Sequence, residues 1–227
     1  SDGSISGLAT ATINYDATAG NFNNGFVVWT GQGNDRITIS SIELTGTTIT
    51  QLYTGAGNDD IQINVHDDID NPLHEQYLFT TERALQVQSG DGADVVDASK
   101  SQLAVNIRSG NDEDIVKGGD GVDIIYGGAA RDILFGGDGN DYMFGEVYGA
   151  DPLINISSDI IFGDHGEVDV VDSNNVTYTI ASSALSFDAR ELVITDVLDR
   201  AASVASLKAG DDEIVAGEGS NIVLGGL

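Results

Sequence analysis

Polar and apolar residues along the centre of this chain follow a pattern with a period of nine. Residues 118–126 read GGDGVDIIY, residues 127–135 read GGAARDILF and residues 136–144 read GGDGNDYMF, with no gap between them. Each unit opens with six mostly small or polar residues that end in Asp, and it closes with three mainly apolar ones. Glycine reaches positive φ without strain, so the first part predicts a tight turn. The apolar part predicts a short strand.

Further copies extend this pattern towards both ends of the chain. Residues 109–117 and 216–224 fall in the same register, and looser copies occupy 30–39, 54–63 and 89–98. Two units make one flattened coil of 18 residues, so the strands of successive coils should stack in parallel about 4.8 Å apart. The apolar residue at the eighth position of each unit should then face the interior. These residues are Ile37, Ile61, Val96, Val116, Ile125, Leu134, Met143 and Val223.

The Asp at the sixth position of each unit should stack on its equivalents in neighbouring coils, because alternate turns lie on opposite sides of a roll. One predicted stack, with a spacing of 18 residues, consists of Asp123, Asp141 and Asp159. The stack on the other side consists of Asp114 and Asp132, joined through longer coils by Asp35, Asp59 and Asp94. The largest excursion between turns should be residues 66–86.

The negative charge of the stacked carboxylates makes these stacks candidate cation sites. The 227 residues include 37 acidic and nine basic side chains, which gives a formal net charge of −28. Stacked carboxylates repel one another unless a cation lies between them. Ca²⁺ takes six to eight oxygen ligands and accepts backbone carbonyls beside carboxylates, and Gly-rich turns that end in Asp supply both. We therefore expect several Ca²⁺ ions, with ligands from Asp35, Asp59, Asp94, Asp114, Asp123, Asp132, Asp141, Asp159, Asp212, Gly118, Asp120, Gly136 and Asp138.

The same composition excludes several classes of protein. Nine basic residues against 37 acidic ones cannot neutralise a nucleic-acid backbone. The chain has no run of 18 apolar residues that would span a membrane. It has no Cys, which excludes disulfides, zinc–thiolate sites and thiol nucleophiles.

Enzyme motifs are incomplete in this sequence. His74-Glu75 begins the metalloprotease pattern HExxH, but residue 78 is Leu, so the second metal ligand is missing. No GxSxG nucleophile elbow occurs. The pair Asp67-Asp68 is better explained as a solvated acidic loop than as the carboxylates of a glycosidase. We expect no enzymatic activity from these residues.

The units at 118–144 resemble the nonapeptide repeats, GGxGxDxUx, of RTX (repeats-in-toxin, haemolysin-type calcium-binding) proteins. This resemblance implies an all-β fold, a right-handed parallel β-roll or β-solenoid with Ca²⁺ bound between adjacent turns. It also implies secretion to the outside of the cell or to the cell surface. Three positions depart from the repeat: Asp112 and Ala130 replace the Gly of the fourth position, and Asn221 replaces the Asp of the sixth.

The chain divides into four segments by the regularity of its repeats. We expect a β-solenoid with longer irregular coils over 1–108, a nonapeptide-repeat β-roll over 109–163 and an insertion packed on the roll over 164–208. The repeat should resume over 209–227 and continue into further repeats. Within the insertion, 168–171 and 176–180 read as strands around a turn, and 188–207 favours extended structure over a helix.

The seventh and ninth residues of each unit should point away from the interior, because strand side chains alternate. In the predicted Asp123–Asp141–Asp159 stack these residues are Ile124, Tyr126, Tyr142, Phe144, Ile160 and Phe162. Six such side chains would form an apolar patch that is seldom left in water. We expect either the segment 164–208 or another molecule to cover it.

Taken together, these features predict an extracellular, Ca²⁺-stabilised structural module of a large repetitive surface protein, such as an adhesin, an S-layer protein or a filament. Its expected partners are Ca²⁺ and neighbouring copies or repeats of the same protein, and neither nucleic acid nor a membrane span. The alternative is the C-terminal RTX accessory module of a secreted enzyme or toxin. Residues that flank this segment would distinguish the two, because further repeats favour the first and a catalytic domain the second.

Overall fold

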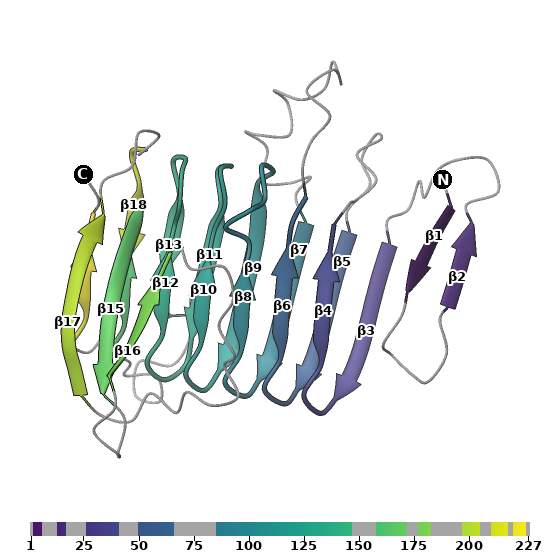
Figure 1. Cartoon of the computed structure of the whole chain (residues 1–227), viewed down its shortest axis with the longest axis horizontal. Helices are drawn as coiled ribbons and strands as arrows, with labels where there is room; N and C mark the ends of the chain where they lie inside the picture. Colours follow the sequence, from purple (N-terminus) through teal and green to yellow (C-terminus); the bar gives the residue numbers. More distant parts are fainter. Residues whose placement is uncertain are drawn as a thin grey trace.

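The described part of the chain is a two-layered parallel β-roll with small antiparallel sheets added to it (Figure 1). The computed structural model describes residues 2–5, 13–16, 26–40, 50–65, 85–146, 158–171, 177–182, 197–204, 210–217 and 220–225. Most of the predicted excursion at 66–86 lies outside these ranges. The prediction of an all-β parallel roll is confirmed.

Sheet 1 is the layer that each coil enters first. Its seven strands pair in parallel in the order β18-β13-β11-β9-β7-β5-β3. They are β3 (Phe26–Gln32), β5 (Thr50–Ala56), β7 (Leu85–Asp91), β9 (Val105–Asn111), β11 (Ile124–Gly128), β13 (Tyr142–Phe144) and β18 (Glu213–Val215).

Sheet 2 is the opposite layer, and the chain alternates between the two. Its seven strands are also parallel, in the order β19-β14-β12-β10-β8-β6-β4. They are β4 (Arg36–Ile39), β6 (Asp60–Ile63), β8 (Val95–Asp97), β10 (Ile115–Lys117), β12 (Ile133–Phe135), β14 (Ile160–Phe162) and β19 (Ile222–Leu224). Figure 1 shows the strands of both sheets side by side along the long axis of the molecule.

The hydrophobic core lies between the two sheets and contains the eighth residue of each unit. Six of the eight residues predicted to face inward are completely buried, namely Ile61, Val96, Val116, Ile125, Leu134 and Met143. Ile37 is half-buried and Val223 is 47 % exposed, since each lies on a strand at the edge of sheet 2. The nine-residue period therefore predicted the core correctly, with lower burial only at the two edge strands.

Two small antiparallel sheets accompany the roll. The first pairs β1 (Asp2–Ile5) with β2 (Ile13–Asp16). The second has the order β16-β15-β17 and consists of β15 (His165–Val171), β16 (Thr177–Ala181) and β17 (Val197–Val204). The strands predicted at 168–171 and 176–180 are confirmed, and so is the extended structure over 197–204.

The hairpin β15–β16 covers an aromatic pair on the outer face of sheet 2. The rings of Phe135 and Phe162 stack with their centroids 4.9 Å apart, and both are completely buried. Val168 of β15 and Ile180 of β16 complete this second apolar cluster. Burial of Phe162 was predicted, and the insertion provides the cover.

The predicted six-residue outer ladder is wrong in one respect, because its members belong to two different sheets. Phe162 pairs with Phe135 in sheet 2, whereas Tyr126 pairs with Phe144 in sheet 1, with ring centroids 4.7 Å apart. The sheet 1 pair is only half-buried, and Tyr142 beside it is 42 % exposed. The apolar side chains are thus divided between a covered face and an open one.

Truncation of the covered aromatic pair should destabilise the roll far more than truncation of the open face. We expect Phe162→Ala to lower the free energy of unfolding by about 3–5 kcal/mol, the usual loss for a buried Phe. The matched change Tyr142→Ala should lower it by less than about 1 kcal/mol, because a partly exposed ring leaves no cavity. Urea unfolding in saturating CaCl₂ measures both. Equal losses would contradict the burial of Phe162 beneath the hairpin.

Candidate metal centre

A ladder of acidic residues runs along the turns that lead from sheet 1 to sheet 2. The backbone N–H of each member donates a hydrogen bond to the side-chain Oδ1 of its equivalent in the next coil, over 2.7–3.0 Å. In order, the members of ladder 1 are Asp35, Asp59, Asp94, Asp114, Asp132, Asp159 and Asn221. This hydrogen bond fixes one oxygen of every carboxyl group above the turn of its neighbour.

A second, shorter ladder occupies the turns that lead from sheet 2 back to sheet 1. Ladder 2 consists of Asp123, Asp141 and Asp212. The N–H of Asp123 donates to Oδ1 of Asp141 over 2.8 Å, and the N–H of Asp141 donates to Oδ1 of Asp212 over 2.9 Å. Oδ1 of Asp123 accepts from the N–H of Val105 at 2.8 Å. In the coils before Val105, the described residues of this side place no Asp in an equivalent hydrogen bond.

The predicted stack of Asp123, Asp141 and Asp159 is wrong for its third member. Asp159 lies in ladder 1, where its Oδ1 accepts from the N–H of Asp132 over 3.0 Å. A spacing of 18 residues predicts two turns between Asp141 and Asp159, but the chain uses this length for one longer turn that starts at Gly145. Asp212 takes the place in ladder 2 instead.

The second carboxyl oxygen of most ladder residues is buried without a partner. Among the described residues, Oδ2 makes no hydrogen bond in Asp35, Asp59, Asp94, Asp114, Asp132, Asp141 and Asp212. A buried polar atom without a partner is strongly unfavourable, and native proteins leave very few of them. Five such atoms in ladder 1 and two in ladder 2 indicate that a ligand with positive charge belongs there.

Glycine at the first position of a unit makes room for this oxygen. A side chain on Gly118 would collide with Oδ2 of Asp123, and one on Gly136 would collide with Oδ2 of Asp141. Gly127 stands in the same relation to Asp132. The carboxylate therefore lies over a glycine Cα in each of these units.

Backbone carbonyls must complete any cation site in these turns. Over the parts of the chain that the structure describes, no three Asp, Glu or His side chains converge as a metal-binding group. Ca²⁺ needs six to eight oxygen ligands, of which carbonyls can provide a large share. The donor set is entirely oxygen and negatively charged, which fits a hard divalent cation such as Ca²⁺ and not a thiolate- or imidazole-bound metal.

Burial raises the pKa of several ladder carboxyls above the ordinary value of 3.8. It raises the pKa of Asp94 and Asp123 to about 7. It raises that of Asp114 and Asp141 to about 9, with neighbouring ladder carboxylates adding to the increase. Burial and then the charges of two ladder neighbours raise the pKa of Asp132 in the same direction. Without a cation, the folded roll therefore favours protonated ladder residues.

In most units the turn backbone adopts the left-handed conformation at the second and fourth positions, although Gly119 and Gly121 of the unit 118–126 do not. Gly128 has φ +123°, and a side chain there would collide with the carbonyl oxygen of Gly110 in the preceding coil. Asp112 and Ala130, which replace Gly at the fourth position, keep the turn geometry with φ values of 73° and 75°. These two units thus retain the regular turn shape at the expense of backbone strain.

The third-position aspartates have different surroundings. The charge of Asp120 adds to the raised pKa of Asp123, which places it close to ladder 2. Asp138 instead contacts the insertion, because its Oδ1 lies 3.0 Å from Nε2 of His165. The other ring nitrogen of His165 lies 3.1 Å from the Ser182 hydroxyl, so the imidazole links the hairpin to the turn.

Sequence reasoning missed that the insertion interrupts a single turn of ladder 2. Gly163 lies at the first position of this turn, where a side chain would collide with Oδ2 of Asp212. Oδ1 of Asp164, which is buried, accepts a hydrogen bond from the N–H of Gly210 over 3.0 Å. The signal was present in the sequence, because Gly163 follows Phe162 as the first position of a unit follows the ninth.

Gly145 is likewise a first-position glycine, and it belongs to a turn of ladder 1. It follows Phe144, and a side chain on it would collide with Oδ2 of Asp159. The four residues before Ser158 contain no Gly, which concealed this relation in the sequence. A first-position glycine therefore lies beside Asp159 and Asp212, as it does beside the three central aspartates Asp123, Asp132 and Asp141.

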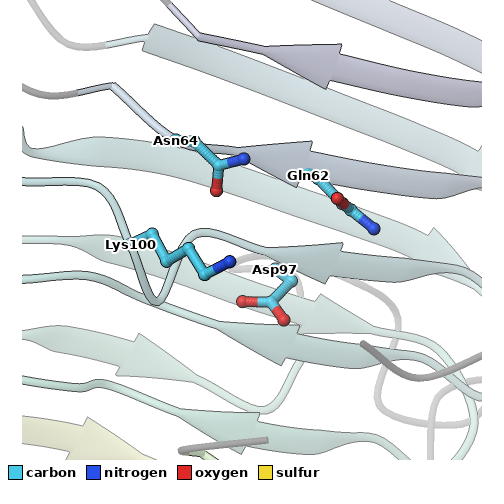
Figure 2. A pocket seen from close by; sticks show the side chains of 4 residues that line it. All are labelled: Gln62, Asn64, Asp97 and Lys100. Atoms are coloured by element: carbon cyan, nitrogen blue, oxygen red, sulfur yellow. The ribbon is translucent and has the colours of Figure 1, made fainter. Parts of the chain in front are cut away.

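A hollow on the outer face of sheet 2 lies apart from the ladders. Gln62, Asn64, Asp97 and Lys100 line it, and their polar ends point towards the same space (Figure 2). Its volume of about 10 Å³ has room for about one water molecule. Beside it, the buried ammonium of Lys117 lies 3.6 Å from Oδ2 of Asp97. This hollow is too small for an organic substrate.

Comparison with known proteins agrees with the chemistry of the ladders. Residues 108–146 and 207–227 match the family model of the RTX calcium-binding nonapeptide repeat, with four copies. No curated protein and no solved structure matches this chain. The described residues contain no helix that is both long and apolar enough to cross a membrane.

The cation-free roll should lose stability as the pH rises from about 4 to about 9. Asp94 and Asp123 have their pKa raised to about 7, and Asp114 and Asp141 to about 9. A raised pKa stabilises the fold fully below the unfolded-state value of 3.8 and no longer does so above the folded-state value. Thermal midpoints of protein dialysed free of divalent cations should therefore fall across this range. Saturating CaCl₂ should remove the fall, and a rise with pH in the cation-free protein would contradict the burial of the carboxyls.

Relief of the strained fourth position should stabilise the roll. We expect Ala130→Gly to raise the free energy of unfolding by about 0.5–1 kcal/mol, because relief of the left-handed Ala exceeds the entropy that Gly loses on folding. The neighbouring change Ala129→Gly is the control, since the φ of Ala129 is not positive. It should lower stability by about 0.5–1 kcal/mol. Urea unfolding at fixed calcium compares the two, and a loss in both variants would contradict the assigned turn.

Proposed function

Because this chain carries RTX calcium-binding nonapeptide repeats, we propose that it is a Ca²⁺-stabilised structural module of a larger extracellular repetitive protein, such as an adhesin, an S-layer protein or a filament. The observation that carries this proposal is the set of seven buried Oδ2 atoms without partners in the two ladders. These atoms belong to stacked coils throughout the roll. A structural role for the ions agrees with this distribution, since a catalytic metal would need one distinct site.

The residues of the chain prepare each turn for the ion. The hydrogen bond from the Asp123 N–H holds Oδ1 of Asp141 in place, so that only Oδ2 remains to be neutralised. First-position glycines such as Gly136 leave space beside that oxygen. Apolar strand residues exclude water from the interior, which strengthens every charge interaction there. When bound, Ca²⁺ would supply the positive charge that offsets the repulsion between successive carboxylates.

On the same energetic grounds we propose that the module works outside the cell. A chain with net charge −28 resists compaction when no cation is present. Metal that binds only the folded state adds its binding free energy to folding. Calcium modules that work outside cells bind with Kd on the order of 10⁻⁴–10⁻³ M. Such a module would be less stable at low calcium and would reach its full stability where calcium is abundant.

Removal of one ladder charge tests the proposal, because it should change the two states in opposite directions. We expect Asp141→Asn to raise the thermal midpoint in EGTA, since an amide avoids the cost of protonating a carboxylate on burial and still provides an acceptor for the Asp123 N–H. In CaCl₂ the same variant should have a lower midpoint than wild type, because a ligand charge is lost. The calcium-induced gain should fall by several degrees.

The reverse substitution, Asn221→Asp, is the matched control at the one position where ladder 1 carries an amide. It should lower the midpoint in EGTA and increase the calcium-induced gain. Differential scanning calorimetry measures both variants under both conditions. The proposal fails if wild type has the same midpoint in EGTA and in CaCl₂, or if Asp141→Asn shifts both midpoints equally.

A further inference from the structure

We propose that the roll consists of a base that stays folded without calcium and a second part that folds onto it only when calcium binds. The base comprises β3–β10, and the calcium-dependent part comprises β11–β14, β18 and β19. This inference rests on the proposed function, because it assumes that calcium stabilises the ladders. It concerns which coils need the ion, and four observations separate the two parts.

The first observation is a row of hydroxyl groups that ties the coils of the base together. Thr and Ser occupy the first position of each ladder 1 unit here, where the later units have Gly or Ala. Each hydroxyl donates to the first-position carbonyl oxygen of the next coil over 2.7–3.1 Å. The donors are Thr30, Thr54, Ser89 and Ser109, and the last acceptor is Gly127. These bonds connect coil to coil inside the protein without any ion.

The second observation is strand length in sheet 1. Strands β3, β5, β7 and β9 each contain seven residues, whereas β11 contains five and β13 and β18 contain three. Longer parallel strands share more backbone hydrogen bonds between neighbouring coils. Neighbouring strands of the base therefore share five or six residue pairs in this sheet, whereas β11–β13 and β13–β18 share three each.

The third observation is the size of the apolar core. Most of the main core cluster belongs to the base, which adds Leu85, Val105, Leu103, Ile63 and Val65 to the eighth-position residues. In the later coils the interior is mainly one residue wide, at Ile125, Leu134, Met143 and Ile161. Between the two sheets, the coils from β5 to β10 therefore bury more apolar residues per coil than the later coils. The additional apolar burial of the later coils lies on the outer face of sheet 2, around Phe135 and Phe162.

The fourth observation is the distribution of buried acid. Within the described residues, each coil of the base carries one ladder Asp, on the side of ladder 1. The coil that ends in Asp123 begins a region in which both sides carry one, with Asp132 opposite Asp141 and Asp159 opposite Asp212. Repulsion without a cation is therefore greater in the coils that have the shorter sheet 1 strands and whose own first-position residues, Gly or Ala, carry no hydroxyl group.

Solenoid proteins permit such a division, because each repeat contacts only its neighbours and stability is nearly a sum over repeats. The open edges of β9 and β10 in the folded base present the parallel partners of β11 and β12 in the correct register. The base would thus act as a template on which the calcium-dependent coils assemble. Calcium can also bind the base through Asp59 and Asp94, but the base does not require it.

Hydrogen–deuterium exchange of the full chain, resolved by mass spectrometry, tests this division directly. In EGTA we expect slow exchange in peptides from β5, β7 and β9 and fast exchange in peptides from β11, β13 and β14. Addition of CaCl₂ should slow exchange in the second group by a large factor and in the first group only slightly. Fast exchange of all strands in EGTA and slow exchange of all in CaCl₂ would overturn the division but keep the proposed function. No response to calcium in any strand would overturn both.

A second variant keeps the test independent of overall stability. Combined replacement of Thr54→Val and Ser89→Ala removes the two hydroxyl ties that join β5 to β7 and β7 to β9 within the base. We expect exchange of β7 and β9 in EGTA to increase by more than about fivefold, since one net hydrogen bond is worth about a factor of five. The control Ser99→Ala removes a hydroxyl that bonds only within its own turn, to Asp97 over 2.6 Å. The inference is wrong if the double variant and the control exchange at the same rate in EGTA.

Discussion

Repulsion between carboxyl groups that are buried one above another is the constraint on which this structure depends. The stacking of parallel coils fixes the vertical spacing, and the hydrogen bond from each backbone N–H to the next Oδ1 fixes the lateral position. Neither can relax without loss of the strand pairing. The remaining oxygen of each carboxyl must then be protonated or neutralised by a cation. Glycine at the first position, positive φ in the turn and a thin apolar interior all follow from building coils around this arrangement.

The sequence was sufficient to predict the parts of the fold that repeat with a fixed period. The apolar eighth residue of each unit predicted the interior, and residues such as Ile125 and Leu134 are completely buried. The spacing of Asp114 and Asp132 predicted ladder 1 correctly, and the looser units at Asp35, Asp59 and Asp94 joined it as expected. These predictions succeed because each follows from residues within one unit and from their alternation along a strand.

Predictions that depended on the number of turns between two units were wrong. A distance of 18 residues between Asp141 and Asp159 is compatible with two short turns or one long turn, and only the pairing of Phe135 with Phe162 shows that the second holds. The sheet assigned to Phe162 changed for the same reason. Ala130 departs from the repeat in the sequence but not in the structure, since the turn imposes a left-handed conformation that its side chain tolerates. In each case neighbouring coils decide the outcome, and one unit alone does not contain the information.

At the interrupted turn of ladder 2, the inserted segment could be replaced by another one. The chain leaves the turn after Asp164 and returns at Gly210, and a hydrogen bond of 3.0 Å joins these two residues. The regular coil is therefore complete except for a gap whose two ends are adjacent, which is the geometry that domain insertion requires. Any folded unit with neighbouring termini could occupy this gap without a change in the stack beneath it. Lineages of such rolls can in this way acquire new surface domains while the calcium ladder stays intact.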